Sequence, residues 1–258
     1  MRHASLRFAC VALFVTFAVA PARADVWLLP GAVTTVTNGN TTRTSAISID
    51  GKITEKDENL LALALAKLKT EGAGLILVSL NSSGGELLPA MRMGRLLRGS
   101  LAHTFVADAG TCSSACVFLL ASGIDRRLES KSRVGLHRPT FPQDILAEME
   151  TSDVRRTYDQ LTAGCQKYLK DMGMDDKLFA DMLRVPSQEI RFVDADYCES
   201  VGLTGTDPGY NEMGRARAIK RWGRDFVDRR DAALKCMKAG TEEADCLKRF
   251  GITELNPK

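Results

Sequence analysis

Residues 110–123 read GTCSSACVFLLASG. A glycine and a cluster of small polar residues lead directly into an apolar run of helix length. Serine is among the residues that best cap a helix, so Ser113 and Ser114 are candidate caps. A helix start also leaves backbone N–H groups unpaired and favours negative charge, which suits a nucleophile that attacks a carbonyl. Taken alone, the stretch favours a helix-capping role for these serines over a role as nucleophile. Motifs elsewhere in the chain bear on which role is correct.

The first 24 residues have the features of a secretory signal peptide. Residues 1–7 are basic, residues 8–20 form an apolar run, and Ala22-Arg23-Ala24 has the small residues of a cleavage site. The apolar run is shorter than the roughly 20 residues of a membrane-spanning helix, which disfavours an uncleaved anchor. We therefore expect a mature chain that begins near Asp25 and is periplasmic or secreted.

Loss of this leader removes the apparent basic character of the chain. The whole chain has 35 Lys and Arg against 32 Asp and Glu, and Arg2, Arg7 and Arg23 lie in the leader, which has no acidic residue. The mature chain is thus formally neutral, and its charge gives no reason to expect a nucleic acid as partner. Its length and apolar fraction suit one globular domain with an appendage.

Six cysteines remain after the leader, and an even number in an exported chain predicts disulfides. Cys236 and Cys246 flank a glycine-containing turn between two helical stretches, so we expect them to be bonded. Cys112 and Cys116 either form a bridge across a distorted first helical turn or act as small core residues. The sequence does not choose among the pairings of the four cysteines other than Cys236 and Cys246. A zinc site is not expected, because no C-x-x-C spacing occurs and histidines are scarce.

Apolar periodicity predicts strands that alternate with helices from residue 46 to residue 208, which is typical of an α/β fold with much parallel pairing. Residues 25–45 have threonines and turn formers without periodicity, and they predict an extended or loose N-terminal segment. Residues 209–258 turn basic and helical and predict a C-terminal helical appendage. The expected strands are 46–49, 75–80, 104–107, 126–128, 132–136 and 192–193, and the expected helices before the appendage are 55–68, 87–97, 116–122, 143–172, 175–183 and 194–199.

Two predicted loops, residues 81–85 and residues 110–114, follow strands and lead into helices. The carboxyl ends of parallel strands meet at one edge of a sheet, so both loops are expected to face one crevice. The glycine pair of the first loop would let its backbone approach a ligand closely. Of the two histidines after the leader, His103 is expected to begin a strand, whereas His137 ends one and can extend into the crevice. Each feature has a structural explanation by itself, but the combination indicates a nucleophile with a base.

The order of these motifs resembles the ClpP-type serine peptidases of the crotonase-like superfamily. The motifs are Asn-Ser-x-Gly-Gly at 81–85, Gly-x-x-x-Ser at 110–114 and Ser-Arg-Val-x-x-His-x-Pro at 132–139, and the similarity extends from Ala46 to Leu203. Among these peptidases the chain is most similar to exported proteins whose serine is bracketed by cysteines. The resemblance implies a ClpP/crotonase-like fold of repeated ββα units and assembly into a homo-oligomer.

The resemblance also implies the roles of the site residues. Ser114 is the nucleophile, rather than Ser113, because it holds the family's position before the apolar helix. His137 is the general base that takes the serine proton. The backbone N–H groups of Ala115 and of the Gly84-Gly85 turn form the oxyanion hole, in which one donor is worth roughly 3 kcal/mol.

Two positions depart from the family pattern. Ser83 replaces the usual proline, which loosens the turn but removes no catalytic atom. Ile190 stands where the family has an aspartate, and isoleucine cannot orient an imidazole. Glu189 is the adjacent carboxylate and our candidate third member, although in an extended segment it points to the opposite face. Asp194 or Asp196 could substitute for it, or activity could survive at a reduced level as a Ser-His dyad.

Other chemistries fit the sequence less well. A cysteine nucleophile would abandon the Ser-His match, and Lys131 as the base of a Ser-Lys dyad has no supporting motif around it. Crotonase-type thioester chemistry needs a coenzyme A substrate, which is cytosolic. In the appendage, Trp222, Phe226 and Leu234 are expected to pack a solvated basic helix onto the body rather than to bind a membrane surface.

The expected function is that of an exported serine hydrolase, a peptidase that uses a Ser-His centre and no cofactor. An exported protein works in a compartment without ATP, so no ATP-driven unfoldase is expected as partner. The substrates would therefore be peptides or unfolded chains. The alternative is a catalytically inactive ClpP-like oligomer that serves as a binding or scaffold protein.

Overall fold

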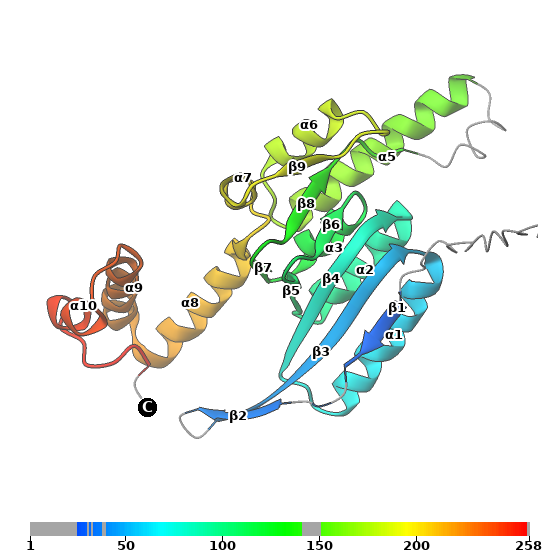
Figure 1. The fold of residues 1–258 in the computed structure, drawn as a ribbon. Helices are drawn as coiled ribbons and strands as arrows, with labels where there is room; N and C mark the ends of the chain where they lie inside the picture. The colour runs from blue at the N-terminus through cyan, green and yellow to red at the C-terminus, as the bar shows by residue number, and fades with distance from the viewer. Residues whose placement is uncertain (1–24, 30, 32, 38–39, 141–150, 257–258) are drawn as a thin grey trace, which may run out of the picture.

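The computed structural model describes residues 25–29, 31, 33–37, 40–140 and 151–256, whose arrangement is shown in Figure 1. Within these residues the chain forms a sheet of ten strands with helices packed against it. The strands are β1 (Asp25–Leu28), β2 (Val33–Thr37), β3 (Asn40–Ile53), β4 (Leu75–Gly85), β5 (His103–Val106), β6 (Thr111–Ser113), β7 (Asp125–Leu128), β8 (Arg133–Leu136), β9 (Arg191–Val193) and β10 (Gly205–Thr206). The helices are α1 (Glu55–Thr70), α2 (Leu87–Gly99), α3 (Cys116–Ser122), α5 (Thr151–Asp171), α6 (Asp176–Arg184), α7 (Ala195–Ser200), α8 (Pro208–Trp222), α9 (Arg224–Lys238) and α10 (Glu243–Arg249).

Parallel pairing dominates the centre of the sheet. β3 pairs with β4, β4 with β5, and β5 with β7, all in parallel. Near its carboxyl end β4 changes partner, because Leu77–Leu80 pair with β5 whereas Ser82 pairs with Cys112 of β6. β6 pairs in parallel with β8, and the antiparallel β9 closes this edge. The α/β fold predicted from the sequence is confirmed, and the carboxyl end of β4 lies at a fork between two groups of strands.

The core lies between the sheet and the first three helices. Every second residue of β4 is buried, as in Ile76, Val78 and Leu80, so one face of this strand is apolar. The helices α1, α2 and α3 pack in sequence, α1 on α2 and α2 on α3, and they lie together beside β3 and β4 in Figure 1. All seven residues of α3 are buried, and this helix contacts β4, β5 and β6. The apolar stretch after Ser114 is therefore the central helix of the core.

Two segments are more regular than the sequence predicted. The prediction of a loop at residues 81–85 is wrong: these residues are the last part of β4, because β3 continues beside them and pairs Ile53 with Gly85. Of the two alternatives for residues 25–45, extended or loose, the structure shows the extended one in the residues that it describes. β1 and β2 pair antiparallel with β3, and β3 itself crosses the boundary expected between residues 45 and 46. Backbone hydrogen bonds, which need no apolar periodicity, order this edge of the sheet.

The C-terminal helices form an appendage with a small core of its own. α8 leads away from the body in Figure 1, and α9 and α10 pack against each other at its end. Ala233, Cys246 and Ile252 are buried there, with Phe226 packed against them. The prediction that Leu234 packs onto the body is wrong, because Leu234 is exposed.

The long helix expected at residues 143–172 is α5 from Thr151 onward, and the earlier part of that prediction lies outside the described residues. None of the helices in the described part of the chain is both long and apolar enough to cross a membrane.

Candidate active site

Ser114 lies at a tight turn between β6 and α3. Its φ of +57° is in the left-handed region, which costs a residue other than glycine about 1–3 kcal/mol. Its N–H donates to the carbonyl oxygen of Gly135 in β8 (3.0 Å), and its own carbonyl oxygen accepts from the N–H of Val117 in α3 (3.1 Å). These two bonds fasten the turn to the sheet and to the helix. A strained serine between a strand and a helix is the geometry that presents a hydroxyl as a nucleophile.

A small pocket of about 50 Å³ opens at this turn. Ser114 lines it together with His137, Gly85 and Ala115. The remaining wall residues are Leu87, Phe118, Pro139, Thr140 and Met182. The structure therefore brings residues from four separate segments of the sequence, the end of β4, the Ser114 turn, the end of β8 and α6, to one site.

The neighbouring Ser113 does not line this pocket. Its side chain is 3% exposed and packs against Gly135, where a Cβ would lie 3.0 Å from the Cβ of Ser113. Its Oγ is buried without a hydrogen-bond partner among the described residues. Ser114, and not Ser113, therefore shares a cavity with the histidine.

His137 follows β8 directly and is half-buried. Its Nδ1 lies 2.8 Å from the carbonyl oxygen of the next residue, Arg138. A carbonyl oxygen only accepts hydrogen bonds, so this contact requires the proton on Nδ1 and leaves Nε2 of the neutral ring as an acceptor. An imidazole in this form can take a proton from a hydroxyl.

The two glycines at the end of β4 have different roles. The N–H of Gly84 already donates to the Oγ of Ser82 (3.0 Å). A Cβ on Gly84 would lie 2.6 Å from the Cβ of Ser114 and 3.1 Å from the nitrogen of Ala115, so only glycine fits beside the serine turn. Gly84 therefore supplies space for the turn, and its N–H is not free to bind an oxyanion.

Gly85 and Ala115 have N–H groups available at the pocket. The next residue after Gly85, Glu86, donates its N–H to Ile53 of β3 (2.9 Å). Since successive N–H groups of a strand point in opposite directions, the N–H of Gly85 points away from β3, toward the side on which β6 pairs. The N–H of Ala115 makes no backbone hydrogen bond to any residue that the structure describes. These two groups are the oxyanion donors that the geometry favours.

The residue opposite His137 is an isoleucine. β8 and β9 pair Gly135 with Phe192 and Leu136 with Arg191, where the ladder ends; continued by one step, this register would set His137 opposite Ile190. A Cβ on Gly135 would lie 2.6 Å from the Cγ2 of Ile190, which places this side chain on the face of β8 that His137 shares. Ile190, the residue at the family's aspartate position, thus lies beside β8 but has an exposed side chain that carries no charge.

The structure does not bring Glu189 to His137. Glu189 is exposed, its N–H turns back to the carbonyl oxygen of Pro186 (3.1 Å), and it does not line the pocket. Because alternate residues of an extended strand point to opposite faces, the residue next to Ile190 faces away from the histidine. No carboxylate in residues 25–140 or 151–256 forms a hydrogen bond or ion pair with His137.

The other candidate groups also lie elsewhere. Asp194 caps α7 by accepting the N–H of Tyr197 (2.8 Å), and Asp196 is exposed on that helix. Lys131 is exposed in the turn before β8, with a φ of +57°, and it does not line the pocket.

The expected Cys236–Cys246 bridge is confirmed, and of the two alternatives for Cys112 and Cys116 the structure shows the bridge. Cys112 and Cys116, with Cα atoms 5.2 Å apart, are fully buried and bracket Ser114. Cys236 and Cys246, with Cα atoms 5.9 Å apart, join α9 to α10 in the appendage. The two other cysteines among the described residues, Cys165 and Cys198, are free, and burial raises the pKa of each thiol to about 12, which keeps them protonated and unreactive.

Asp181 anchors the helix that carries Met182 to the pocket. Its carboxylate accepts hydrogen bonds from Tyr197 (2.9 Å) and Arg184 (2.6 Å) and pairs with Lys177 at 3.2 Å. Burial alone would raise the pKa of Asp181, but these hydrogen bonds and positive charges outweigh it and lower the pKa below 3.8. The cluster ties α6 to α7 and so holds one wall of the pocket.

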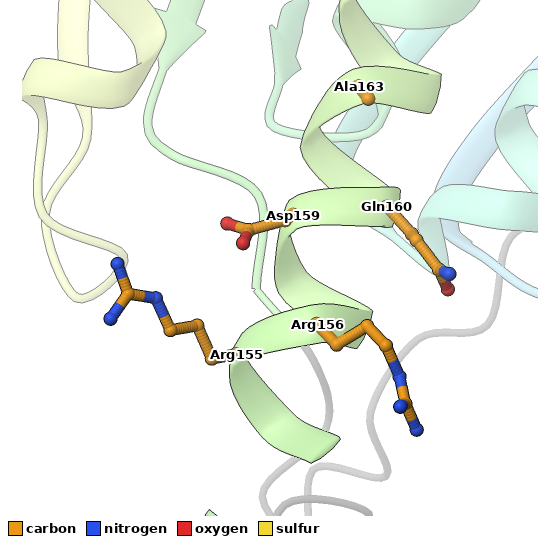
Figure 2. Close-up of a pocket in the computed structure, with 5 residues that line it drawn as sticks. All are labelled: Arg155, Arg156, Asp159, Gln160 and Ala163. Carbon is orange, nitrogen blue, oxygen red and sulfur yellow. The ribbon is translucent and has the colours of Figure 1, made fainter. Parts of the chain in front are cut away.

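A larger hollow of about 470 Å³ lies along α5. Its lining residues are Arg155, Arg156, Asp159, Gln160 and Ala163 (Figure 2). All of them come from one helix, the two arginines extend to different sides of it, and none is a nucleophile, so this hollow lacks the elements of a catalytic site. Across the described residues, no group of three or more His, Cys, Asp or Glu side chains is placed to hold a metal ion.

Sequence reasoning missed Arg138 and Met182. The contribution of Arg138 to the site is a backbone carbonyl oxygen, which no residue type signals in a sequence. Met182 comes from α6, whose apolar periodicity showed an amphipathic helix but not the pocket it would reach. The X-Pro dipeptide at Arg138-Pro139 was a usable signal, because proline restricts the residue before it to an extended backbone.

The chain is similar to a known protein family and to two solved structures. The sequence model described as "Clp protease" matches residues 32–174. No curated protein matches the chain. Similar solved structures include a lysine-to-alanine mutant of the 1510-N membrane-bound stomatin-specific protease in complex with a substrate peptide (14% identity, TM-score 0.47, 62% of this chain and 71% of that one). A serine-to-alanine mutant of the same protease is also similar (13% identity, TM-score 0.48, 62% of this chain and 75% of that one). Because the family model matches more than half of the sequence, the chain belongs to the Clp protease family.

Proposed function

We propose that the chain is an exported, ATP-independent serine peptidase with Ser114 as nucleophile and His137 as general base. The observation that carries this proposal is the shared pocket: a serine held at a φ of +57° lines it together with the histidine and with Gly85 and Ala115. A structural serine that only capped α3 would have no reason to adopt a costly backbone conformation beside an imidazole.

The chemistry follows from the atoms at the pocket. Nε2 of His137, which the contact of Nδ1 with a carbonyl leaves unprotonated, accepts the proton of the Ser114 hydroxyl as the oxygen attacks a peptide carbonyl. The N–H groups of Gly85 and Ala115 stabilise the oxyanion that forms. His137 then returns the proton to the leaving amine, and water repeats the sequence on the acyl-enzyme.

The pocket wall supports a preference for small apolar side chains. Leu87, Phe118 and Met182 are apolar, and Phe118 and Met182 are almost completely buried, at 1% exposure each. A volume of about 50 Å³ leaves room for a short side chain next to the serine. The substrates in this proposal are peptides or unfolded chains, since an exported enzyme lacks an ATP-driven unfoldase.

Two features support an exported enzyme. The leader at residues 1–24 has the organisation of a signal peptide, and disulfides such as Cys112–Cys116 and Cys236–Cys246 persist in oxidising compartments. We extend the proposal to a periplasmic or secreted homo-oligomer, as is common for ClpP-like proteases.

Labelling with a fluorophosphonate, which reacts with activated serines, tests the proposed centre. The exported chain should label, and Ser114→Ala and His137→Ala should not. Ser113→Ala is the matched control: it removes the neighbouring hydroxyl, which lies outside the pocket, and should label like the wild type. Wild-type protein that does not label would favour the alternative, an inactive scaffold, for which Ile190 opposite His137 is the specific argument.

A further inference from the structure

We infer that Arg138 is a positioning residue whose backbone carbonyl orients His137 in place of the carboxylate that is missing at position 190. The inference rests on the Ser114–His137 centre proposed above. It answers the question that Ile190 raises, namely what holds the imidazole if no carboxylate faces it.

Arg138 is clamped to the end of α6 by two hydrogen bonds. Its backbone N–H and its side-chain Nε both donate to the carbonyl oxygen of Val185, at 3.0 Å and 3.2 Å. Val185 caps the C-terminus of α6, where the helix dipole attracts a guanidinium. Pro139 follows Arg138 and limits its backbone to the extended region. The peptide unit that carries the Arg138 carbonyl is therefore fixed on both sides.

The clamped carbonyl determines how the histidine ring lies. It accepts a hydrogen bond from Nδ1 of His137 at 2.8 Å, which selects the tautomer with the proton on Nδ1 and leaves Nε2 as the acceptor of a ring that lines the pocket. Orienting the ring and fixing its tautomer are two of the tasks that a third triad member performs. A carbonyl oxygen performs both of them without a charge.

The side chain of Arg138 can be removed while the carbonyl stays. Arg138→Met keeps the length of the side chain and the backbone bond to Val185 but loses the Nε donor, so the clamp should loosen. We expect fluorophosphonate labelling of Ser114 to slow about three- to tenfold, the effect of one hydrogen bond. Arg127→Met is the matched control, because Arg127 is exposed, pairs with Asp125 and lies on β7, which β5, β4 and β6 separate from β8 in the sheet. It should label at the wild-type rate.

Nitrogen-15 NMR of the imidazole rings gives a readout that does not depend on activity. In the wild type, neutral His137 should carry its proton on Nδ1, and in Arg138→Met a growing share should carry it on Nε2. Rescue is the second arm: Ile190→Asp, combined with Arg138→Met, should return labelling to the wild-type rate or above, because a carboxylate at that register position faces the ring.

Each result decides the inference. An Arg138→Met variant that keeps both the wild-type tautomer and the wild-type labelling rate overturns it, as does a His137 ring that carries its proton on Nε2 in the wild type. If the wild type shows the Nδ1 tautomer and Arg138→Met shifts it, the positioning role holds even where the wild type does not label. In that case the proposed peptidase activity fails and the orientation of His137 by Arg138 stands.

Discussion

Removal of the Cys112–Cys116 bridge should slow labelling of Ser114, whereas removal of the Cys236–Cys246 bridge should lower stability and leave labelling unchanged. The bridge closes a ring of five residues, 112–116, with Ser114 at its centre. In Cys112→Ala/Cys116→Ala both sulfurs are removed and the ring is open. The Cys236→Ala/Cys246→Ala variant is the control, because that bridge lies in the appendage and closes a larger ring, with a sequence separation of 10 against 4.

The expected losses of stability and of labelling rate differ between the two variants. Chain entropy gives the five-residue ring about 2 kcal/mol of stabilisation and the appendage ring about 3 kcal/mol. The left-handed conformation of Ser114 costs about 1–3 kcal/mol, so the smaller ring is worth about as much as the strain it contains. If the whole of that constraint holds the serine in its attacking position, its loss slows labelling by up to about 30-fold. The hydrogen bonds from Ser114 to Gly135 and from Val117 to Ser114 remain in the variant, so we expect a value near tenfold.

The assay is the rate of fluorophosphonate labelling, measured beside the thermal unfolding midpoint of each variant. The appendage variant should lose at least as much stability and keep its labelling rate, whereas the Ser114-bridge variant should lose labelling by about tenfold. A Ser114-bridge variant that labels at the wild-type rate would refute the idea that the disulfide positions the serine. Equal loss of labelling in both variants would show that the effect is one of global stability. Alkylation in denaturant, before and after reduction, verifies that Cys165 and Cys198 are the free thiols in the wild type.

Three further predictions concern single side chains. Gly84→Ala should abolish labelling, because its Cβ would lie 2.6 Å from that of the serine at a φ of +104°, whereas Gly164→Ala, in open space on α5, should leave labelling unchanged. Glu189→Gln should change labelling by less than about twofold, the scale of an exposed side chain, and a loss as large as that of His137→Ala would place Glu189 in the centre. The lowered pKa of Asp181 adds stability that is present above about pH 4 and is lost as pH falls through its folded pKa. Urea unfolding at about pH 7 and about pH 3 should therefore show a smaller acid-induced loss in Asp181→Asn than in the wild type, and identical losses would contradict this.

The fold was predictable because its periodic segments contain the information that pairs them. Leu75–Leu80 is apolar enough to be a buried strand, and α1 and α2 show their apolar faces at helical spacing. The edge strands β1 and β2 were not predictable in this way, since their order comes from backbone bonds to β3 rather than from side-chain pattern. The same reason hid the last part of β4, whose polar and glycine residues are extended because β3 runs beside them.

In the candidate site, too, side-chain groups were predictable from the sequence and backbone groups were not. Ser114 and His137 were predictable because their chemistry is in their side chains and their motifs fix their places at strand ends. The free N–H at Gly85 and the occupied one at Gly84 were not, because the difference depends on which of them meets Ser82. A sequence identifies side chains directly, but half of the groups in the proposed catalytic centre are backbone groups, which it does not identify.

The carbonyl of Arg138 and the side chain of Ile190 together constrain how well such a centre can work. A neutral acceptor fixes the tautomer of His137, but it adds no negative charge to offset the imidazolium that forms when the serine is deprotonated. The apolar side chain of Ile190 adds none either. The disulfide around Ser114 and the bonds of its turn act on a different part of the barrier, because they keep the nucleophile in place before the reaction begins. A centre built in this way depends on the placement of its groups more than on charge. Loosening the Arg138 hydrogen bonds or the Cys112–Cys116 bridge should therefore slow labelling more than loss of the Glu189 carboxylate does.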